Sequence, residues 1–581
     1  MPSPNLAANF LSRAFYDILS FMKNITLTLV AAASLALSIS AACGANDRPV
    51  LRIGAMSDNH LHADRTNTHV RTKACFDLFR RENVDIVVDT GDIADLSHVS
   101  ELKAFRRYFD EAFAGTDCVP FFCIANHDYN YLPGTKKNDP KNFENASRAL
   151  GMPGVNPTAV VKGYRFVNVF QNEPDPKAFA NAVAKAVAAN RGNRPVFVVN
   201  HVPPMLTTTG TVHWSSQAVR DVLNRYPQVV ALTGHIHTAI SWAANVWQGE
   251  FTAVNLGAHA EYSNKIDGEA TVLSVYADRI DIRRYEAVSG REIGADDRWS
   301  IPLPLDPKHG PYRPEVRAQT CPVPALPADA AVRYEQDPSG QGGTLVFSSA
   351  APRGKAKHYR ITLESQQADG AWKFLGTLNW SAPQVLEEPA SWECELSPAM
   401  LDGGRPHRAT IVPVSSFDVA GKGRTFPFDV PASPLKALPA ELTRIVRYQR
   451  SNAPGKDVFA PSADGWFEKD KGNVVAVLPK ELNGALQKAK AAILRVDVAS
   501  EQSARPNTFS LGKFEAAGGN VVFGVGGRFY TLPGNYAAHR YVWTIARGGK
   551  RPKPGDEICL VIREGDRGRF RINEITCFLV P

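Results

Sequence analysis

Short apolar runs alternate with helical patterns along the first half of the chain. Each run is six to eight residues long, which suits a buried strand. The spacers between them carry apolar residues at helical intervals, as in Thr68–Asn83, Val99–Phe113 and Pro176–Asn190. Strands that alternate with helices indicate an α/β layered domain. The predicted strands are Leu51–Ser57, Val84–Thr90, Cys118–Ala125, Tyr164–Phe170, Pro195–Asn200, Gln228–Thr233, Glu250–Leu256, Ala270–Ala277 and Arg279–Glu286.

The pattern changes at a proline-dense stretch, Pro302–Asp329, which is typical of a stiff linker. Beyond it the helical spacing fades, and alternating runs separated by Gly and Pro turns predict β-sandwiches. The predicted segments are an α/β domain at residues 47–305, a linker at 306–330, a fibronectin- or immunoglobulin-like β-sandwich at 331–430, a linker at 431–442 and a jelly-roll-like β-sandwich at 443–581.

The first residues have the composition of an export signal. A charged start at Met22 precedes an apolar run, Ile25–Ile39, and small residues follow. We therefore expect residues 1–46 to be a signal region with Met22 as the true start, and the protein to be periplasmic, secreted or on the cell surface. Cys43 follows small residues as in a bacterial lipoprotein site, although Ser40 stands where that motif prefers Leu. A membrane partner is expected only if Cys43 is lipidated.

Composition narrows the function classes. Of the 581 residues, 44% are hydrophobic and 21% are charged, which allows several ordinary cores. The net charge of +8 is modest and forms no long basic run, so no nucleic-acid-binding motif is present, although an anionic substrate is mildly favoured. The eight cysteines include no CxxC pair, which argues against a zinc ribbon or a thioredoxin-like site. Export would permit a disulfide between Cys559 and Cys577, with two buried free thiols as the open alternative.

Polar side chains gather where five of the predicted strands end. In open α/β sheets, the carboxyl ends of the strands are where ligands bind. The side chains are mainly Asp, Asn and His, and carboxylate oxygen with imidazole nitrogen suits Mn, Fe or Zn better than Ca or Mg. The clusters are Asp58-Asn59-His60, Gly91-Asp92-Ile93-Ala94-Asp95, Ala125-Asn126-His127-Asp128, His201 and Gly234-His235-Ile236-His237.

In this order the clusters resemble the motifs of the calcineurin-like metallophosphoesterase family, which are DxH, GDxxD, GNH(D/E), a lone H and GHxH. The resemblance covers about residues 50 to 285. It implies a four-layer α/β/β/α sandwich for this domain, and the two all-β sandwich domains that the alternating pattern predicts would follow it. One departure is Ala125, where the family has glycine. It adds one methyl group to a tight loop and removes no ligand.

The resemblance also implies a metal-dependent phosphoric ester hydrolase. Two divalent transition metal ions (Mn, Fe, Zn or Ni) would provide a bridging hydroxide that attacks a phosphomono- or phosphodiester. His127 would protonate the leaving oxygen or stabilise its charge, and Asp128 would orient His127. Purple acid phosphatases carry an iron-binding tyrosine at the position of Asp95, so we expect no tyrosinate colour here. The implied ligands are Asp58, His60 and His237 for one ion, Asn126, His201 and His235 for the other, and Asp92 as the bridge.

Several interpretations stay open beside this one. His213 and His259 are candidates for substrate contacts, with structural roles as the alternative. The β-sandwich modules could bind a glycan or another cell-surface ligand. A second hypothesis is a surface glycan- or protein-binding protein with a relic phosphoesterase domain, but a relic should have lost some of the seven ligands, and all are present. A protein Ser/Thr phosphatase is the weaker third hypothesis, because phosphoproteins are largely intracellular.

Overall fold

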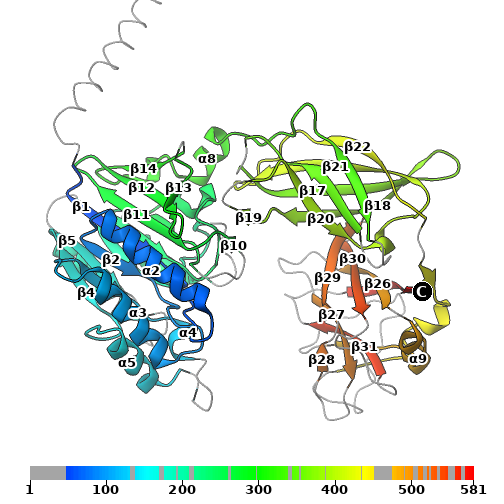
Figure 1. Ribbon diagram of the computed structural model, residues 1–581, viewed down its shortest axis with the longest axis horizontal. Coiled ribbons are helices and arrows are strands. Elements are labelled where there is room, and N and C mark those ends of the chain that lie inside the picture. The colour runs from blue at the N-terminus through cyan, green and yellow to red at the C-terminus, as the bar shows by residue number, and fades with distance from the viewer. Residues whose placement is uncertain are drawn as a thin grey trace, which may run out of the picture. The chain divides into compact units, whose positions relative to one another are not determined.

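The structure is a computed structural model, and it divides into two compact units (Figure 1). The first unit comprises residues 1–241 and 245–313, and the second comprises residues 242–244 and 314–581. The predicted signal region and His213 lie outside the part that the structure describes. The described residues are 48–130, 136, 138–168, 170, 176–190, 194–208, 215–259, 264–295, 297–337, 343–352, 355–385, 388–432, 435–450, 474–489, 491–500, 508–514, 520–522, 525–532, 537–546, 557–563 and 570–580.

A seven-stranded sheet of the first unit is built around β1 (Leu51–Met56). Strand β1 pairs in parallel with β2 (Ile86–Asp89), which pairs in parallel with β3 (Val119–Phe122). The carboxyl ends of these three strands therefore meet at one edge. On its other side β1 pairs antiparallel with β11. The remaining strands of this sheet are β11 (Glu269–Val275), β12 (Arg279–Glu286), β13 (Arg291–Ile293) and β14 (Trp299–Pro302).

The second sheet of this unit has six strands in the order β4-β5-β6-β7-β9-β8. Strands β5, β6, β7 and β9 run parallel, and β4 and β8 close the two edges antiparallel. The bounds are β4 (Thr158–Val161), β5 (Tyr164–Asn168), β6 (Val196–Val199), β7 (Val229–Thr233), β8 (Val246–Gln248) and β9 (Thr252–Asn255).

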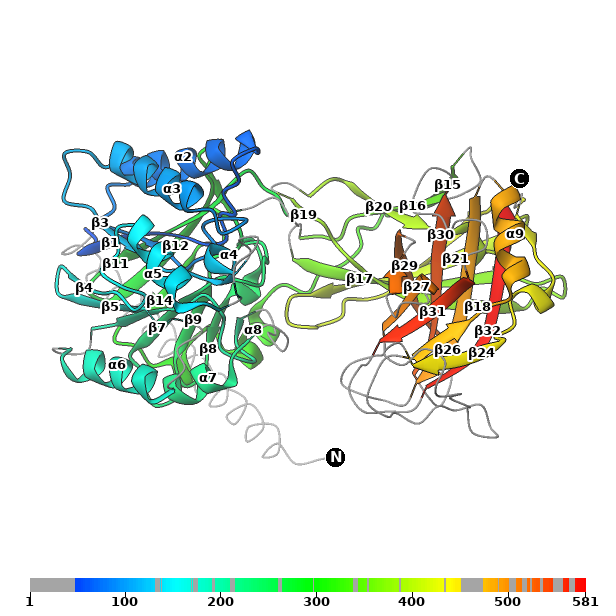
Figure 2. The ribbon, with the colours of Figure 1, turned by 90° about the horizontal axis from the view of Figure 1, so that it is seen from below.

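Helices cover the outer face of each sheet, which gives the predicted α/β/β/α layers (Figure 2). Helices α2 and α3 cover the first sheet, and α6 and α7 cover the second. Between the sheets, Ile53 and Val88 of the first belong to one buried cluster with Phe166 and Leu232 of the second. The helices are α2 (Thr66–Arg81), α3 (Val99–Ala112), α4 (Asn126–Tyr129), α5 (Pro140–Ala149), α6 (Pro176–Ala188) and α7 (Gln217–Leu223).

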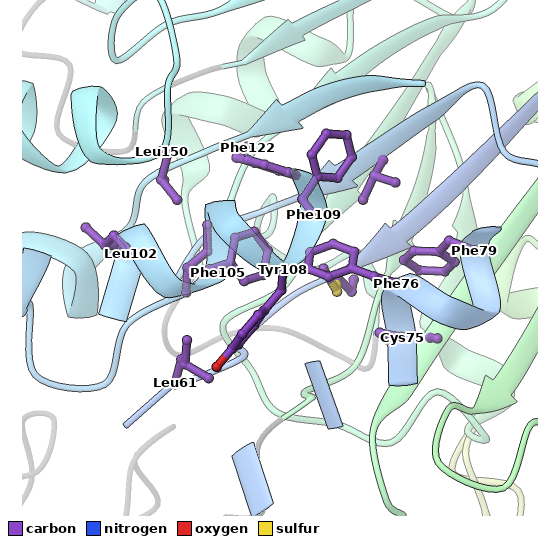
Figure 3. Close-up of a cluster of buried hydrophobic side chains, with 14 of the residues drawn as sticks. Leu61, Cys75, Phe76, Phe79, Leu102, Phe105, Tyr108, Phe109, Phe122 and Leu150 are labelled. Atoms are coloured by element: carbon purple, nitrogen blue, oxygen red, sulfur yellow. The ribbon is translucent and has the colours of Figure 1, made fainter. Parts of the chain in front are cut away.

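Aromatic side chains fill the core between the first sheet and its helices (Figure 3). The ring centroid of Phe76 in α2 lies 5.1 Å from that of Phe105 in α3, which lies 5.0 Å from that of Phe122 in β3. Gly54 in β1 leaves room for Phe79, since a Cβ at Gly54 would lie 2.7 Å from the Phe79 ring. Each such buried ring stabilises the fold by about 1.5–3 kcal/mol, so this core holds the first sheet and its helices together.

The second unit is mostly β, as predicted (Figure 1). Its largest sheet has nine strands in the order β22-β21-β17-β18-β29-β30-β26-β32-β23. Because Thr377 of β18 pairs with Thr531 of β29, strands from both predicted sandwiches share this sheet. The elements are α8 (Pro314–Thr320), β15 (Val332–Gln336), β16 (Gly343–Ser348), β17 (Ala356–Gln366), β18 (Trp372–Ser381), β20 (Ser391–Leu396), β21 (Pro406–Ser415), β22 (Arg424–Asp429), β23 (Lys436–Ala437), β24 (Arg447–Arg450), β25 (Val474–Val477), α9 (Lys480–Lys488), β26 (Ala491–Ser500), β27 (Thr508–Phe514), β28 (Asn520–Val522), β29 (Val525–Leu532), β30 (Ala537–Ala546), β31 (Glu557–Arg563) and β32 (Phe570–Val580).

Some features differ from the sequence pattern or add to it. Helix α8 lies inside the predicted linker at 306–330. Cys577 is buried with a free thiol, which favours the alternative of free thiols over a disulfide, while the side chain of Cys559 lies outside the described part. Within the described residues, no helix has the length and apolar character needed to span a bilayer.

Candidate metal centre

The loops that carry the sequence motifs meet through backbone hydrogen bonds. After β1 and β2, the N–H of Asp58 donates to the carbonyl of Gly91 at 3.0 Å. After β6 and β7, the N–H of Gly234 donates to the carbonyl of His201, also at 3.0 Å. The two sheets are joined here because the N–H of His235 donates to Oδ2 of Asp58 at 2.9 Å. The motifs of both sheets thus converge on one site.

One ligand cluster consists of Asp58, His60 and His237, as the family resemblance implies. Their ligand atoms all lie within 4.8 Å of one another. Nε2 of His237 lies 3.1 Å from Oδ1 of Asp58 and 3.2 Å from Nε2 of His60. Asp58 and His60 are at most 1% exposed, whereas the side chain of His237 is 23% exposed. The cluster is therefore buried, with His237 on its more open side.

A second cluster consists of Asp92, His201 and His235, again within 4.8 Å of one another. Nε2 of His201 lies 3.1 Å from Oδ2 of Asp92 and 3.1 Å from Nδ1 of His235. Asp92 also belongs to a third such group, with His60 and His127. The carboxylate of Asp92 therefore belongs to the second cluster and also approaches His60 of the first, as a bridging ligand must.

The donor atoms of these clusters fit divalent transition metals. Each cluster combines one carboxylate with two imidazoles, a set that suits Mn, Fe, Zn or Ni better than Ca or Mg. Burial and the His201 charge lower the pKa of His235 to about 4, so this imidazole is neutral near pH 7, the form that binds a metal. The residues present therefore fit a binuclear centre.

Without a metal ion, a proton on His201 partly balances the negative charges of Asp92 and Asp58. Burial lowers the pKa of His201, but the carboxylates of Asp92 and Asp58 outweigh it and raise the pKa to about 9. Burial raises the pKa of Asp92, but His201 outweighs it and lowers the pKa to about 2. The same imidazole, together with His237, holds the pKa of Asp58 well below its usual range despite complete burial. A bound cation would replace these protons, so metal binding should release protons.

Asp95 contacts the imidazole of His60 on the side away from the cluster. Its carboxylate lies 3.3 Å from Nδ1 of His60 and 3.2 Å from the guanidinium of Arg65, and it is 3% exposed. The carboxylate can pair electrostatically with this ring from the Nδ1 side, and it leaves Nε2 for a metal. The sequence alone indicates no contact between Asp95 and a ligand, only that Asp95 stands where purple acid phosphatases have a tyrosine. The only signal was its place in the GDxxD motif.

Ser57 and Thr90 support Asp58 in the same way. The hydroxyl of Thr90 donates to that of Ser57 at 2.5 Å, and the Ser57 hydroxyl donates to Oδ2 of Asp58 at 2.5 Å. Both hydroxyl residues are fully buried. Nothing in their sequence spacing predicts this chain of hydrogen bonds, because it joins the ends of two neighbouring strands.

His127 and Asp128 have different surroundings from those predicted. Nδ1 of His127 lies 2.8 Å from the carbonyl oxygen of Asp95. The carboxylate of Asp128 instead accepts the N–H groups of Asp92 (3.1 Å), Ala94 (2.7 Å) and Ala125 (2.8 Å). Asp128 thus holds the two loops against each other, and the predicted orienting contact to His127 comes from the Asp95 backbone.

Asn126 is the first residue of α4 and precedes a residue that contacts Asp92. The N–H of the next residue, His127, donates to Oδ1 of Asp92 at 2.8 Å. Ala125 precedes α4 with φ −137° and ψ −173°, an extended conformation open to any residue, so the missing glycine causes no strain there. The methyl group of Ala125 faces Gly91, where a Cβ would lie only 2.6 Å away. The ligand role of Asn126 stays a prediction.

Most of the candidate ligands have left-handed backbone conformations, which non-glycine residues rarely adopt. Such conformations cost of order 1–3 kcal/mol each and gather at functional sites. Sequence reasoning did not find this feature, because tertiary contacts impose it. The positive φ angles are 53° at Asp58, 42° at His60, 54° at Asp92, 70° at His235 and 47° at His237.

His259 is buried away from solvent, at 1% exposure. Its Nδ1 lies 3.3 Å from the carbonyl of Glu269 and 3.5 Å from the thiol of Cys75. Burial lowers its pKa to about 4. These contacts favour the structural role over the predicted substrate contact.

The family model described as Calcineurin-like phosphoesterase matches residues 51–239, which contain all seven candidate ligands. This part of the chain is therefore a calcineurin-like phosphoesterase domain. No curated protein matches the chain.

Among solved structures, the chain is similar to a dimetal phosphatase from Danio rerio, with 13% identity, 43% of this chain and 98% of that chain covered, and a TM-score of 0.32. It is also similar to a purple acid phosphatase isolated from yellow lupin (Lupinus luteus) seeds, with 14% identity, 44% and 55% covered, and a TM-score of 0.32. A third similar structure is a human fibronectin III domain, with 16% identity, 19% and 85% covered, and a TM-score of 0.14.

Proposed function

We propose that this protein is a binuclear metal-dependent hydrolase of phosphomono- or phosphodiesters. The observation that carries the proposal is the pair of neighbouring carboxylate–imidazole clusters, since Asp92 of one cluster also groups with His60 of the other. Asp58, His60 and His237 would hold one metal ion, and Asp92 would contact both. Asn126, His201 and His235 would hold the other.

Two divalent ions bound there would activate water as the nucleophile and neutralise the charge of the phosphate group. The protein's own residues fix the ligands. Asp95 holds the ring of His60, and Ser57 holds the carboxylate of Asp58. Because these partners are buried, they keep the ligands in place before a substrate arrives.

His127 is the proposed proton donor to the leaving oxygen. A carbonyl oxygen only accepts, so Nδ1 of His127 carries the hydrogen that Asp95 receives at 2.8 Å. Nε2 is then the nitrogen that can exchange a proton with a substrate. The His127 side chain is 25% exposed, and its ring centroid lies 4.5 Å from that of His60. It is thus both next to the centre and reachable from solvent.

The test uses metal-stripped full-length protein with Mn, Zn, Fe or Ni restored singly. The substrates are nitrophenyl phosphate and bis-nitrophenyl phosphate, whose relative rates separate a monoesterase from a diesterase. We expect His127→Ala to keep two bound metal ions and lower kcat by about 10²–10⁴-fold. Asp92→Asn should lose metal. The matched control is His309→Ala, which removes an imidazole whose side chain is 79% exposed.

The outcomes separate the hypotheses. Metal-dependent turnover that His127→Ala and Asp92→Asn abolish, and that His309→Ala keeps, would support the hydrolase. If the wild-type protein binds no metal ion, the hydrolase proposal is refuted, and the alternative of a binding protein with a relic phosphoesterase domain is favoured. In that case the β-sheets of the second unit would be tested for glycan or cell-surface ligands.

Export is a separate proposal, carried by the sequence of the signal region alone. Expression of the full chain in a bacterial host, followed by fractionation, should place the mature protein outside the cytoplasm. Mass spectrometry of the N-terminal peptide then shows whether Cys43 is the first residue of the mature protein and carries a lipid. A lipidated Cys43 would place the protein in the detergent phase, and Cys43→Ser would release it. Full-length protein retained in the cytoplasm with residues 22–46 uncut would contradict export.

A further inference from the structure

The loop from Gly234 to Ile240 carries ligands of both proposed metal sites. His235 belongs to one cluster and His237 to the other. Both have left-handed backbone, with φ of 70° and 47°. An isolated loop would not hold two such residues, because each costs of order 1–3 kcal/mol. The loop therefore needs support from outside itself.

Asn255 braces the start of this loop. It ends β9, where it pairs with Thr233 of β7, and it is 1% exposed. Its Nδ2 donates to the carbonyl of Gly234 at 3.0 Å, and its Oδ1 accepts the N–H of Gly257 at 3.1 Å. The same Oδ1 lies 3.3 Å from the hydroxyl of Thr238. One buried amide thus contacts the loop on both sides of the two histidines.

Asn245 braces the far side of the loop and is fully buried. Its Nδ2 donates to the carbonyl of Ala239 at 2.5 Å, and its Oδ1 accepts from the hydroxyl of Thr238 at 3.0 Å. The hydroxyl of Thr238 therefore lies between the two asparagines. A buried polar group that loses its hydrogen-bond partner destabilises the fold. Breaking these contacts should therefore cost free energy of folding.

Residues of the first sheet fix the end of the loop. Oε1 of Glu269 in β11 accepts the N–H of Ile240 at 3.2 Å, and the guanidinium of Arg284 in β12 donates to the Ile240 carbonyl at 3.3 Å. Both side chains are at most 3% exposed. Gly257 makes room for Glu269, since a Cβ there would lie 2.0 Å from Oε2. The loop is thus braced from both sheets.

We propose that Asn255, Asn245 and Thr238 are positioning residues that present His235 and His237 to the two metal ions. This inference rests on the proposed function. It adds that both metal sites depend on one braced loop. Removing one of the bracing side chains should therefore weaken the binding of both metal ions. A ligand variant such as His235→Ala should differ, because it removes a donor from one site.

The test measures metal binding by full-length protein, not turnover. Metal-free protein is titrated calorimetrically with Zn²⁺ and then with Mn²⁺, and the stoichiometry is checked by elemental analysis. Asn255→Ala should weaken both binding steps by about 10–100-fold. Thr238→Val, which keeps the shape and removes the hydroxyl, should weaken both by a smaller factor, and Thr238→Ser should restore them. Hydrogen exchange of the 234–240 amides in metal-free Asn255→Ala should be faster than in the wild type.

The matched control is Asn168→Ala. Asn168 is 3% exposed and donates from Nδ2 to a backbone carbonyl, that of Val155, at 2.7 Å, so it braces a different loop. It should lose a similar amount of stability and keep both metal ions. If Asn255→Ala binds both ions as tightly as Asn168→Ala does, the inference is overturned and the proposed function stands. If the wild type binds no metal, both fall.

Discussion

Asp95 contacts a proposed metal ligand with its side chain and the proposed proton donor with its backbone. Its carboxylate lies 3.3 Å from Nδ1 of His60, and its carbonyl oxygen lies 2.8 Å from Nδ1 of His127. Both contacts are made on the Nδ1 side of the imidazole and leave Nε2 available. Because the two contacts come from different atoms, a change of the side chain should separate them.

Asp95→Asn should weaken metal binding more than it affects proton donation. The substitution removes the charge that supports His60 and leaves the backbone carbonyl in place. We expect metal affinity to fall about 10–100-fold, with kcat at saturating metal nearly unchanged. Calorimetry and steady-state rates at high metal measure the two effects. Asp64→Asn, which changes an exposed carboxylate in the loop between β1 and α2, is the control. Unchanged affinity would mean that Asp95 only stabilises the loop.

The metal-free protein should lose stability as the pH rises from 6.5 to 9. The folded pKa of His201, about 9, lies above its usual 6.5, so its contribution is complete below pH 6.5 and disappears as the pH passes 9. Burial and then Asp92 raise the pKa of Asp128 to about 8, which works in the same direction. Carboxylates whose pKa is lowered, such as that of Asp92, are fully ionised between pH 6.5 and 9 and do not change this trend.

Melting temperatures of metal-free and metal-loaded protein at pH 6.5 and 9 test this directly. The metal-free protein should melt lower at pH 9, and bound metal should shrink the difference because the ion replaces the proton. Equal melting temperatures at the two pH values without metal would show that the His201 proton does not support the fold.

At the scale of elements, the sequence predicted β1, β2, β3, β5, β6, β7, β9, β11 and β12 and the strand ends at which the motifs lie, but it missed the strands β4, β8, β13 and β14. The runs that end at the motifs are short and apolar, and β2, β6 and β7 are buried along their whole length, which leaves a clear signal. Helix α5 was missed although Asp139 caps it, accepting the N–H of Lys141 at 3.0 Å, with Pro140 as its first residue. The helix left little hydrophobic periodicity in the sequence, because only Ala146 and Ser147 of its residues are buried.

The candidate ligands were predicted from their positions after strands, whereas their support was not. The contact of Asn255 with Gly234 joins residues 21 apart in sequence. The contact of Ser57 with Thr90 joins residues 33 apart. Such pairs are set by sheet register and loop packing, which a single sequence does not reveal. The same holds for the left-handed φ of Asp58.

Gly234→Ala should disturb the site through close packing of two loops. A Cβ there would lie 1.8 Å from the hydroxyl of Ser57 and 2.5 Å from Oδ2 of Asp58. Both atoms must move, so we expect about 1–3 kcal/mol of destabilisation together with loss of metal binding. Gly154→Ala is the matched control, since a Cβ at Gly154 meets nothing within 4 Å. Urea unfolding and metal titration measure the two effects, and normal metal affinity in Gly234→Ala would refute this account.

At the scale of the molecule, the cores indicate where the chain can be divided. Among the residues that the structure describes, the clusters of the first unit contain residues up to Tyr312 and none beyond it. The main cluster of the second unit joins residues between Leu326 and Val430 with Ile493, which crosses the predicted linker at 431–442. The nine-stranded sheet crosses the same linker. The first unit is thus self-sufficient in its core, whereas the predicted sandwich at 331–430 is not.

A fragment of residues 48–313 should therefore fold cooperatively and bind two metal ions with the affinity of the full chain, because all seven candidate ligands and their braces lie within it. Its kcat/KM on bis-nitrophenyl phosphate should agree with the full chain within a few-fold. A fragment of residues 314–581 should also fold. Residues 331–430 alone should expose the apolar surface that Ile493 covers, and should bind a hydrophobic dye or aggregate. If the fragment 331–430 unfolds cooperatively and is as stable alone as it is within 314–581, the two predicted sandwiches are independent domains instead.

The fragment 48–313 has its own contrary outcome. If it loses metal binding, residues of the second unit support part of the site.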